Sequence, residues 1–242
     1  SHLDREPNWL AAGEFDDAWT NILFVGRMIA NKKIEDLIRW FHAYHTIFNP
    51  RSRLLLVGAQ TQFERYVASL HQLVARLGTP HVHFAGHVSD EELVAFYDVA
   101  DLFLCASEHE GFCVPLVEAF YKELPVLAYA ATAVPSTMDG AGVLFEDRDP
   151  VHVAQLIDAI VSDAALQDKL VEGQLAAVGR LRAKDFAGTL LGFVDDILSK
   201  PRAAGPAVTF DFWGQFDAAE QLEELRLYRP AIYKALPPPP CA

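Results

Sequence analysis

Residues 101–130, DLFLCASEHEGFCVPLVEAFYKELPVLAYA, contain two short apolar runs separated by an amphipathic stretch. The runs Asp101–Cys105 and Val126–Ala130 predict strands, and Pro115–Lys122 predicts a helix between them. Continuous apolar runs are typical of strands covered by helices on both faces of a sheet. This unit therefore predicts two parallel strands joined by a helix.

The same alternation continues on both sides of this unit. Ser89, followed three residues later by Glu92, fits the capping box that begins a helix. The other predicted elements are strands at Asn21–Val25, Arg53–Val57, His81–Ala85 and Gly142–Phe145, and helices at Ile34–Phe48, Phe63–Leu77, Ser89–Ala100, Val151–Ser162, Ala164–Leu181 and Asp185–Ser199. The predicted fold class is α/β, a Rossmann-like doubly wound parallel sheet of about six strands. Ligands of such sheets bind beyond the carboxyl ends of the strands.

The chain is expected to have three parts: an N-terminal segment or linker at 1–20, a ligand-binding domain at 21–200 and a C-terminal tail at 201–242. Lys200–Pro206 is rich in Pro, Gly and Ala and predicts a linker. The tail carries Phe210–Trp213 and the amphipathic stretch Asp217–Tyr228, with a Pro run at Pro237–Pro240. It is too short to build its own core, so we expect it to dock on another surface.

Composition limits the partners and the compartment. The 242 residues carry a formal charge of -13, which argues against nucleic acid as the main partner but leaves room for a small anion. No apolar run approaches the roughly 18 residues of a membrane span, and no signal peptide is seen. The expected location is cytoplasmic, with a peripheral position at the inner membrane face in the full-length protein.

Neither the cysteines nor the histidines show the spacing of a metal site. Cys105, Cys113 and Cys241 form no CxxC or Cys/His pattern, and are interpreted as unpaired thiols of a reduced protein. His81, His83 and His87 surround one predicted strand without the spacing of paired ligands. No metal is therefore expected.

The loop after the first predicted strand, Gly26–Lys33, contains two basic residues that suit a diphosphate. Arg27 offers a planar fork to phosphate oxygens, whereas Lys32 offers a compact charge. The alternative is a solvated basic loop. No G-x-G-x-x-G or Walker pattern follows any strand, which argues against dinucleotide-binding and P-loop proteins.

The loop Ser107–Glu118 combines a helix start with two carboxylates. Pro115 suits the first turn of a helix, whose free N–H groups and dipole favour an anion. Glu110 and Glu118 stand eight positions apart, too far for the close carboxylate pair of a glycosidase. We expect them to hold different hydroxyls of one extended ligand; taken singly, each could be a surface residue or a partner of the helix dipole.

Four segments, in the order in which the family has them, resemble the retaining GT-B glycosyltransferases of family 4. They are Gly26-Arg27 with Lys32 as G-R-x-x-x-x-K, Phe84–Val88 as F-x-G-x-V, Glu110–Glu118 with its E-x7-E motif, and Pro125–Pro135 as the region of the fifth strand. The resemblance implies the C-terminal, donor-binding half of a GT-B fold. It further implies a hexosyltransferase of polysaccharide or glycoconjugate biosynthesis that uses a nucleoside-diphosphate sugar, without cofactor or divalent cation.

The resemblance implies roles for individual residues. Glu118 would hold the ribose hydroxyls, and Glu110 would contact the donor sugar near the reacting carbon. Arg27 and Lys32 would neutralise the departing diphosphate. The implied catalytic residues are Glu110, Arg27 and Lys32, and the implied donor- or nucleotide-binding residues are Gly26, Gly86, His87, Val88, Gly111, Phe112, Cys113, Val114, Pro115, Leu116 and Glu118. Amides at 111–113 would hold sugar hydroxyls, amides at 114–116 would hold phosphate, and 86–88 would border the base.

Three residues depart from the family pattern by replacing a customary Gly. They are Lys33, Cys113 and Glu123; the last stands at a helix end where a left-handed residue is expected. The acceptor, a glycan or another hydroxyl compound, would bind mainly to an N-terminal half that this chain lacks, so the isolated chain is expected to be inactive. The alternatives are a non-catalytic nucleotide-sugar-binding or interaction module, a GT-B epimerase or phosphorylase, and a generic Rossmann-like domain.

Overall fold

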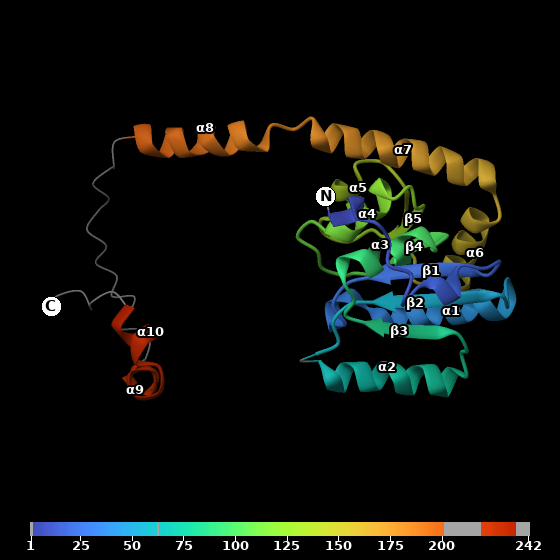
Figure 1. The fold of residues 1–242 in the computed structure, drawn as a ribbon, viewed down its shortest axis with the longest axis horizontal. Coiled ribbons are helices and arrows are strands. Elements are labelled where there is room, and N and C mark those ends of the chain that lie inside the picture. The colour runs from blue at the N-terminus through green and yellow to red at the C-terminus, as the bar shows by residue number, and fades with distance from the viewer. Residues whose placement is uncertain (1, 62, 201–218, 236–242) are drawn as a thin grey trace. The chain divides into compact units, whose positions relative to one another are not determined.

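The computed structural model describes residues 2–61, 63–200 and 219–235 of the chain. Its parallel strands form one six-stranded sheet in the order β3-β2-β1-β4-β5-β6 (Figure 1). The strands are β1 Thr20–Val25, β2 Ser52–Val57, β3 Val82–Gly86, β4 Leu102–Cys105, β5 Val126–Tyr129 and β6 Val143–Phe145. The strand order reverses between β1 and β4, and ligands of open α/β sheets bind at such a switch point. The predicted doubly wound fold is confirmed.

Helices connect every pair of consecutive strands. The α-helices are α1 Ile34–Ile47, α2 Glu64–Leu77, α3 Asp90–Asp98, α4 Val114–Tyr121, α5 Val134–Met138, α6 Pro150–Val161, α7 Ala164–Arg182, α8 Phe186–Ser199, α9 Ala219–Tyr228 and α10 Pro230–Ala235, with short 3-10 helices at His2–Asp4, Gly13–Phe15 and Ala30–Lys32. The predicted helices are all present within a residue or two. Helix α5 was not predicted, because Val134–Met138 lies in none of the predicted helices or strands; Pro135 stands in the first turn of this short helix.

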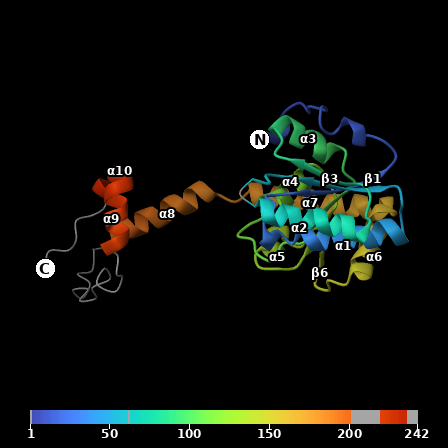
Figure 2. The same ribbon diagram turned by 90° about the horizontal axis from the view of Figure 1, so that it is seen from below.

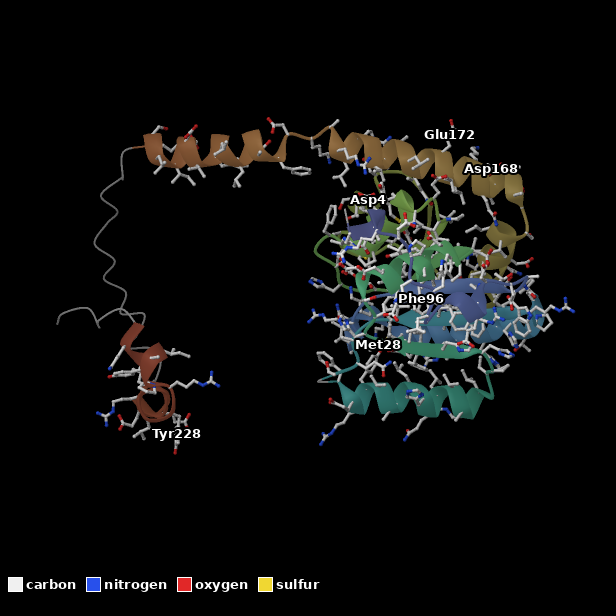
Figure 3. The ribbon with its side chains drawn as sticks, in the orientation of Figure 1. Asp4, Met28, Phe96, Asp168, Glu172 and Tyr228 are labelled. Carbon is white, nitrogen blue, oxygen red and sulfur yellow. The ribbon has the colours of Figure 1, made fainter. Side chains whose placement is uncertain are left out.

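The sheet lies between two helical layers (Figure 2). One face packs against α3, α4 and α7, and the other against α1, α2 and α6. Alternate residues of each strand point to opposite faces, so Leu23 joins the first core and Phe24 the second. Phe96 and Met28, labelled in Figure 3, are buried in the first and second core, respectively.

Helix α7 shows how the outer layer is joined to the sheet. Its Asp168 and Glu172 point away from the sheet (Figure 3), whereas Gln174 on the inner side is fully buried. The Gln174 side chain accepts a hydrogen bond from the Val126 N–H and donates one to the Leu124 carbonyl. Both polar ends of this buried amide are therefore satisfied, and α7 is fixed to the start of β5.

The N-terminal segment packs onto the face that carries α3. Leu3 and Phe15 are buried in the first core, and the Asn8 N–H donates to the Glu91 carbonyl. The predicted capping box of α3 is confirmed: the Ser89 hydroxyl accepts from the Glu92 N–H and the Glu92 carboxylate accepts from the Ser89 N–H.

The chain divides into two compact units, 1–184 and 185–242. In the second unit, α8 exposes its apolar side chains, among them Phe186, Phe193 and Ile197. Phe210–Trp213, Pro237–Pro240 and most of the predicted linker lie outside the described residues, and the three-part division at 20 and 200 stays a prediction. Among the described residues, no helix is long and apolar enough to cross a membrane.

All three residues that replace a customary Gly have a left-handed backbone. Lys33, Cys113 and Glu123 have φ angles of 51°, 64° and 57°. At the end of α4, the N–H of Glu123 donates to the Phe120 carbonyl and that of Leu124 to the Ala119 carbonyl, which is the pattern of a Schellman motif. Since a residue with a Cβ pays roughly 1 kcal/mol for this conformation, each position stores some strain.

Glu123→Gly is therefore expected to stabilise the protein by about 0.5–1 kcal/mol, the relief of backbone strain less the extra freedom that Gly gives the unfolded chain. The melting temperature should rise by about 2 °C. Glu123→Ala is the control, since it removes the same exposed carboxylate and keeps the strain. An equal rise in both variants would assign the gain to charge rather than to backbone conformation.

Candidate functional site

The loops that follow β1 and β4 are held together at the carboxyl edge of the sheet. The Glu108 N–H donates to the Asn31 carbonyl at 2.9 Å, and the Asn31 side-chain amide donates to the His109 carbonyl at 3.0 Å. These bonds bring the loop after β1 (the basic loop, residues 26–33) into contact with the loop after β4 (the acidic loop, residues 106–113) across the switch point of the sheet. Asn31 was not among the predicted site residues, although it stands next to Lys32.

Lys32 and Glu110 form a close ion pair at the centre of this contact. Their side chains are only 15% and 9% exposed, so the pair is shielded from solvent. Burial acts to raise the pKa of Glu110, but hydrogen bonds from Lys32 and neighbouring side chains, together with the positive charge of Lys32, outweigh it, and the pKa lies below its ordinary value. Glu110 is therefore ionised at neutral pH, and the two further N–H donors of Lys32 remain available to a ligand.

Arg27 stands apart from this pair. Its side chain is exposed and makes no hydrogen bond or ion pair with any residue that the structure describes. A guanidinium that has no partner in the protein can bind an anion without first giving up an internal contact. The two predicted cations therefore differ, with Lys32 already paired and Arg27 available.

The start of α4 offers a row of unpaired backbone donors. Within the described residues, the N–H groups of Gly111, Phe112, Cys113 and Val114 have no hydrogen-bond acceptor. Consecutive N–H groups around a left-handed residue at a helix N-terminus form a concave anion site. Two further predicted positions contribute less, because Pro115 has no N–H and the N–H of Leu116 donates to the Cys113 carbonyl at 3.1 Å.

Two threonines hold the acidic loop from the side of β5. The Thr132 hydroxyl accepts from the Glu110 N–H at 2.9 Å, and the Thr137 hydroxyl donates to the Phe112 carbonyl. Thr137 lies in α5 and Thr132 lies two residues before it; this short helix was not predicted. The sequence contained no signal for these contacts beyond the proximity of the neighbouring strands.

Glu118 lies inside the first turns of α4 with its side chain only 13% exposed. The buried Tyr97 hydroxyl donates to one carboxylate oxygen at 2.9 Å, and His2 Nε2 lies 3.0 Å from the other. Burial, together with the negative charge of Glu118, raises the pKa of Tyr97 well above its ordinary value, so the phenol stays protonated and keeps donating. Tyr97 therefore helps to fix the orientation of a carboxylate that is largely shielded from solvent.

Three glycines meet at the ends of β1, β2 and β3. The Gly58 N–H donates to the Gly86 carbonyl, and a Cβ on Gly58 would come within 1.9 Å of the Gly26 carbonyl oxygen. Gly58 was not among the predicted site residues. A glycine is required there because its backbone approaches that of Gly26 so closely. Beside Gly86, His87 is exposed and Val88 packs against the first core.

Arg148 adds a cation that was not predicted. It lies after β6, pairs with Glu108 at 2.5 Å, donates to the Ala106 carbonyl and covers the Tyr129 ring. Lys33 pairs with the other Glu108 oxygen at 3.1 Å. These two cations neutralise Glu108 and hold the acidic loop, which distinguishes them from Arg27.

A small cluster of potential metal ligands lies beneath the acidic loop. The sulfurs of Cys105 and Cys113 and a carboxylate oxygen of Glu110 all lie within 4.8 Å of one another. A hydrogen bond from the Cys113 thiol lowers the pKa of Cys105 to about 7, and in turn the pKa of Cys113 is raised. The spacing of these residues gave no hint of the cluster, because the fold and not a short motif brings β4 and the start of α4 together.

Comparison of the sequence with known proteins places this geometry in context. The profile described as glycosyl transferases group 1 matches residues 7–174. The O-antigen chain mannosyltransferase B of Escherichia coli is 28% identical over 173 residues, covering 70% of this chain and 43% of that protein. The D-inositol 3-phosphate glycosyltransferase of Acidothermus cellulolyticus is 29% identical over 194 residues, covering 76% and 42%. The chain thus spans less than half the length of these relatives.

The fold also matches solved structures. The crystal structure of Anabaena HepE in complex with UDP and glucose superposes with a TM-score of 0.61 at 23% identity, covering 76% of this chain and 49% of that one. This similarity concerns the fold of the described domain.

Proposed function

The chain belongs to the family of glycosyl transferases group 1, and we propose that it is the donor-binding half of a retaining hexosyltransferase of the GT-B family 4 type. The donor is a nucleoside-diphosphate sugar. The acceptor, a glycan or another hydroxyl compound, binds on the other half of the full-length enzyme. The chain matches 43% and 42% of the length of the two relatives, which supports the proposal that donor and acceptor bind to different parts of the full-length enzyme.

The observation that carries the proposal is the group of unpaired donors around the start of α4. Four backbone N–H groups without an acceptor among the described residues lie at the same edge of the sheet as the exposed Arg27 and as Lys32, which has donors to spare beyond its ion pair. A diphosphate supplies several charged acceptor oxygens for such donors. The oriented Glu118 then suits the ribose on one side of the diphosphate, and Glu110 suits the sugar on the other.

In the reaction, the bond between the anomeric carbon and the diphosphate oxygen breaks while the acceptor oxygen forms a new bond to the same carbon and passes its proton to the departing diphosphate oxygen. Negative charge grows on the leaving diphosphate, where Arg27, Lys32 and the α4 amides stabilise it. Glu110 stays ionised and faces the positive charge that develops at the sugar ring. Attack from the side of the leaving group would retain the configuration of the anomeric carbon, and the leaving group can be neutralised without a divalent cation. The proposed location is the cytoplasm.

Calorimetric titration with UDP, GDP and ADP tests the donor site. We expect at least one of them to bind this chain with a Kd below about 1 mM, whereas the matching nucleoside, which lacks the diphosphate, should bind at least about tenfold more weakly. Donor hydrolysis or transfer by the full-length protein then separates an enzyme from a non-catalytic nucleotide-sugar-binding module. Absence of binding in both this chain and the full-length protein would contradict the proposal.

A further inference from the structure

The cluster beneath the acidic loop has the donor atoms of a site for a thiophilic metal ion. Cys105 is the last residue of β4, Cys113 precedes α4, and Glu110 lies in the loop between them. Their ligand atoms all lie within 4.8 Å of one another, and Cys105 and Cys113 are 1% and 7% exposed. Two sulfurs and one carboxylate oxygen match the ligand types that zinc accepts.

A buried hydroxyl beside the cluster provides a second observation. Ser107 is fully buried, and its Oγ makes no well-formed hydrogen bond with the residues described in the structure. Ser107 stands two residues after Cys105, in the loop that also carries Glu110. A buried hydroxyl without a partner is energetically unfavourable, which indicates a ligand in the adjacent space. A metal-bound water would supply that partner.

The charges of the cluster also suit a dication. Two thiolates and the Glu110 carboxylate carry three negative charges, and the paired Lys32 offsets one of them. A divalent ion would bring the buried group to neutrality, which removes the cost of burying uncompensated charge. Soft sulfur ligands favour zinc over magnesium or calcium, which prefer oxygen.

We propose that Cys105, Cys113 and Glu110 bind a zinc ion. A water would be the fourth ligand, and the Ser107 hydroxyl would form a hydrogen bond with that water. The site shares Glu110 with the sugar position, and its Cys113 also supplies one of the unpaired N–H groups at the start of α4. Zinc would therefore hold Glu110 away from the donor sugar and inhibit transfer; this last step rests on the proposed function. Cys113 replaces a residue that is customarily Gly in the family, so the site distinguishes this chain from relatives that keep Gly.

Metal binding can be tested on the full chain in its reduced, metal-free form, without any nucleotide. Cobalt(II) should bind at one equivalent, show the charge-transfer absorption of a thiolate ligand, and be displaced by zinc. Cys113→Gly should weaken cobalt binding by at least about tenfold and lose this absorption, because it removes one of two thiolates. Glycine accommodates the φ of 64° at this position, so the variant is expected to fold.

Two further variants complete the experiment. Cys105→Ser should abolish the absorption as well, whereas Cys241→Ser should bind cobalt like the unaltered chain. Absence of thiolate absorption in the unaltered chain, or equal binding by Cys113→Gly, would overturn the proposal. Formation of a Cys105–Cys113 disulfide with peroxide in a chain that binds no metal would also overturn it, in favour of a redox pair. Because no nucleotide is present, these results do not depend on the donor site.

Discussion

Replacement of Glu118 by alanine is expected to raise the Kd of the preferred nucleoside diphosphate by about 10- to 100-fold. The carboxylate would accept hydrogen bonds from the ribose hydroxyls, and a hydrogen bond to a charged group is worth about 1.5–3 kcal/mol. The effect should be large because Tyr97 already fixes the carboxylate at 2.9 Å, so little conformational freedom is lost on binding. Calorimetric titration of this chain measures the change.

The controls separate the ribose contact from a loss of charge or of folding. Glu123→Ala removes a carboxylate two residues after the last residue of the same helix, α4, and should leave the Kd unchanged. Tyr97→Phe keeps Glu118 but frees its orientation, so the Kd should rise by only about 3- to 10-fold. If Glu118→Ala binds like the unaltered chain while its melting curve stays normal, Glu118 does not contact the nucleotide.

The architecture could be predicted from the sequence because its signals are local. Apolar runs such as Leu102–Cys105 and the Ser89–Glu92 capping box depend on residues close together in the chain, and the parallel direction of the strands follows from the alternation of strands and helices. The left-handed position of Glu123 was equally local, since a helix end followed by Pro125 predicts it. Helix α5 was missed because its single turn is too short for a periodic pattern.

The contacts within the candidate site could not be predicted, because they join residues far apart in sequence. Tyr97 reaches Glu118 from another helix, and Thr132 reaches the Glu110 backbone from beyond β5. Neither Tyr97 nor Thr132 belongs to a recognisable sequence motif, because buried and loop hydroxyl groups occur in many structural roles. The sequence motif indicates Glu110 and Glu118 as candidate ligand-binding carboxylates, whereas only the structure identifies the hydroxyl groups that contact the Glu118 side chain and the Glu110 backbone.

Replacement of Glu110 by alanine is expected to lower turnover of the full-length enzyme by about 10²- to 10³-fold, the usual loss when one group that stabilises transition-state charge is removed. Binding of the bare nucleoside diphosphate to this chain should behave differently. Loss of Glu110 releases Lys32 from its ion pair and leaves its full charge for the diphosphate. The Kd should therefore stay unchanged or fall, even though turnover drops.

Glu108→Ala is the matched control, because it removes an exposed carboxylate two residues earlier in the same loop. Glu108 pairs with Lys33 and Arg148 and faces neither Lys32 nor the α4 amides, so its loss should affect turnover far less than that of Glu110. The decisive comparison is between Glu110→Ala and Glu118→Ala. If both weaken binding of the bare nucleotide equally, the assignment of one carboxylate to the sugar and the other to the ribose is wrong, because only the ribose is present in that ligand.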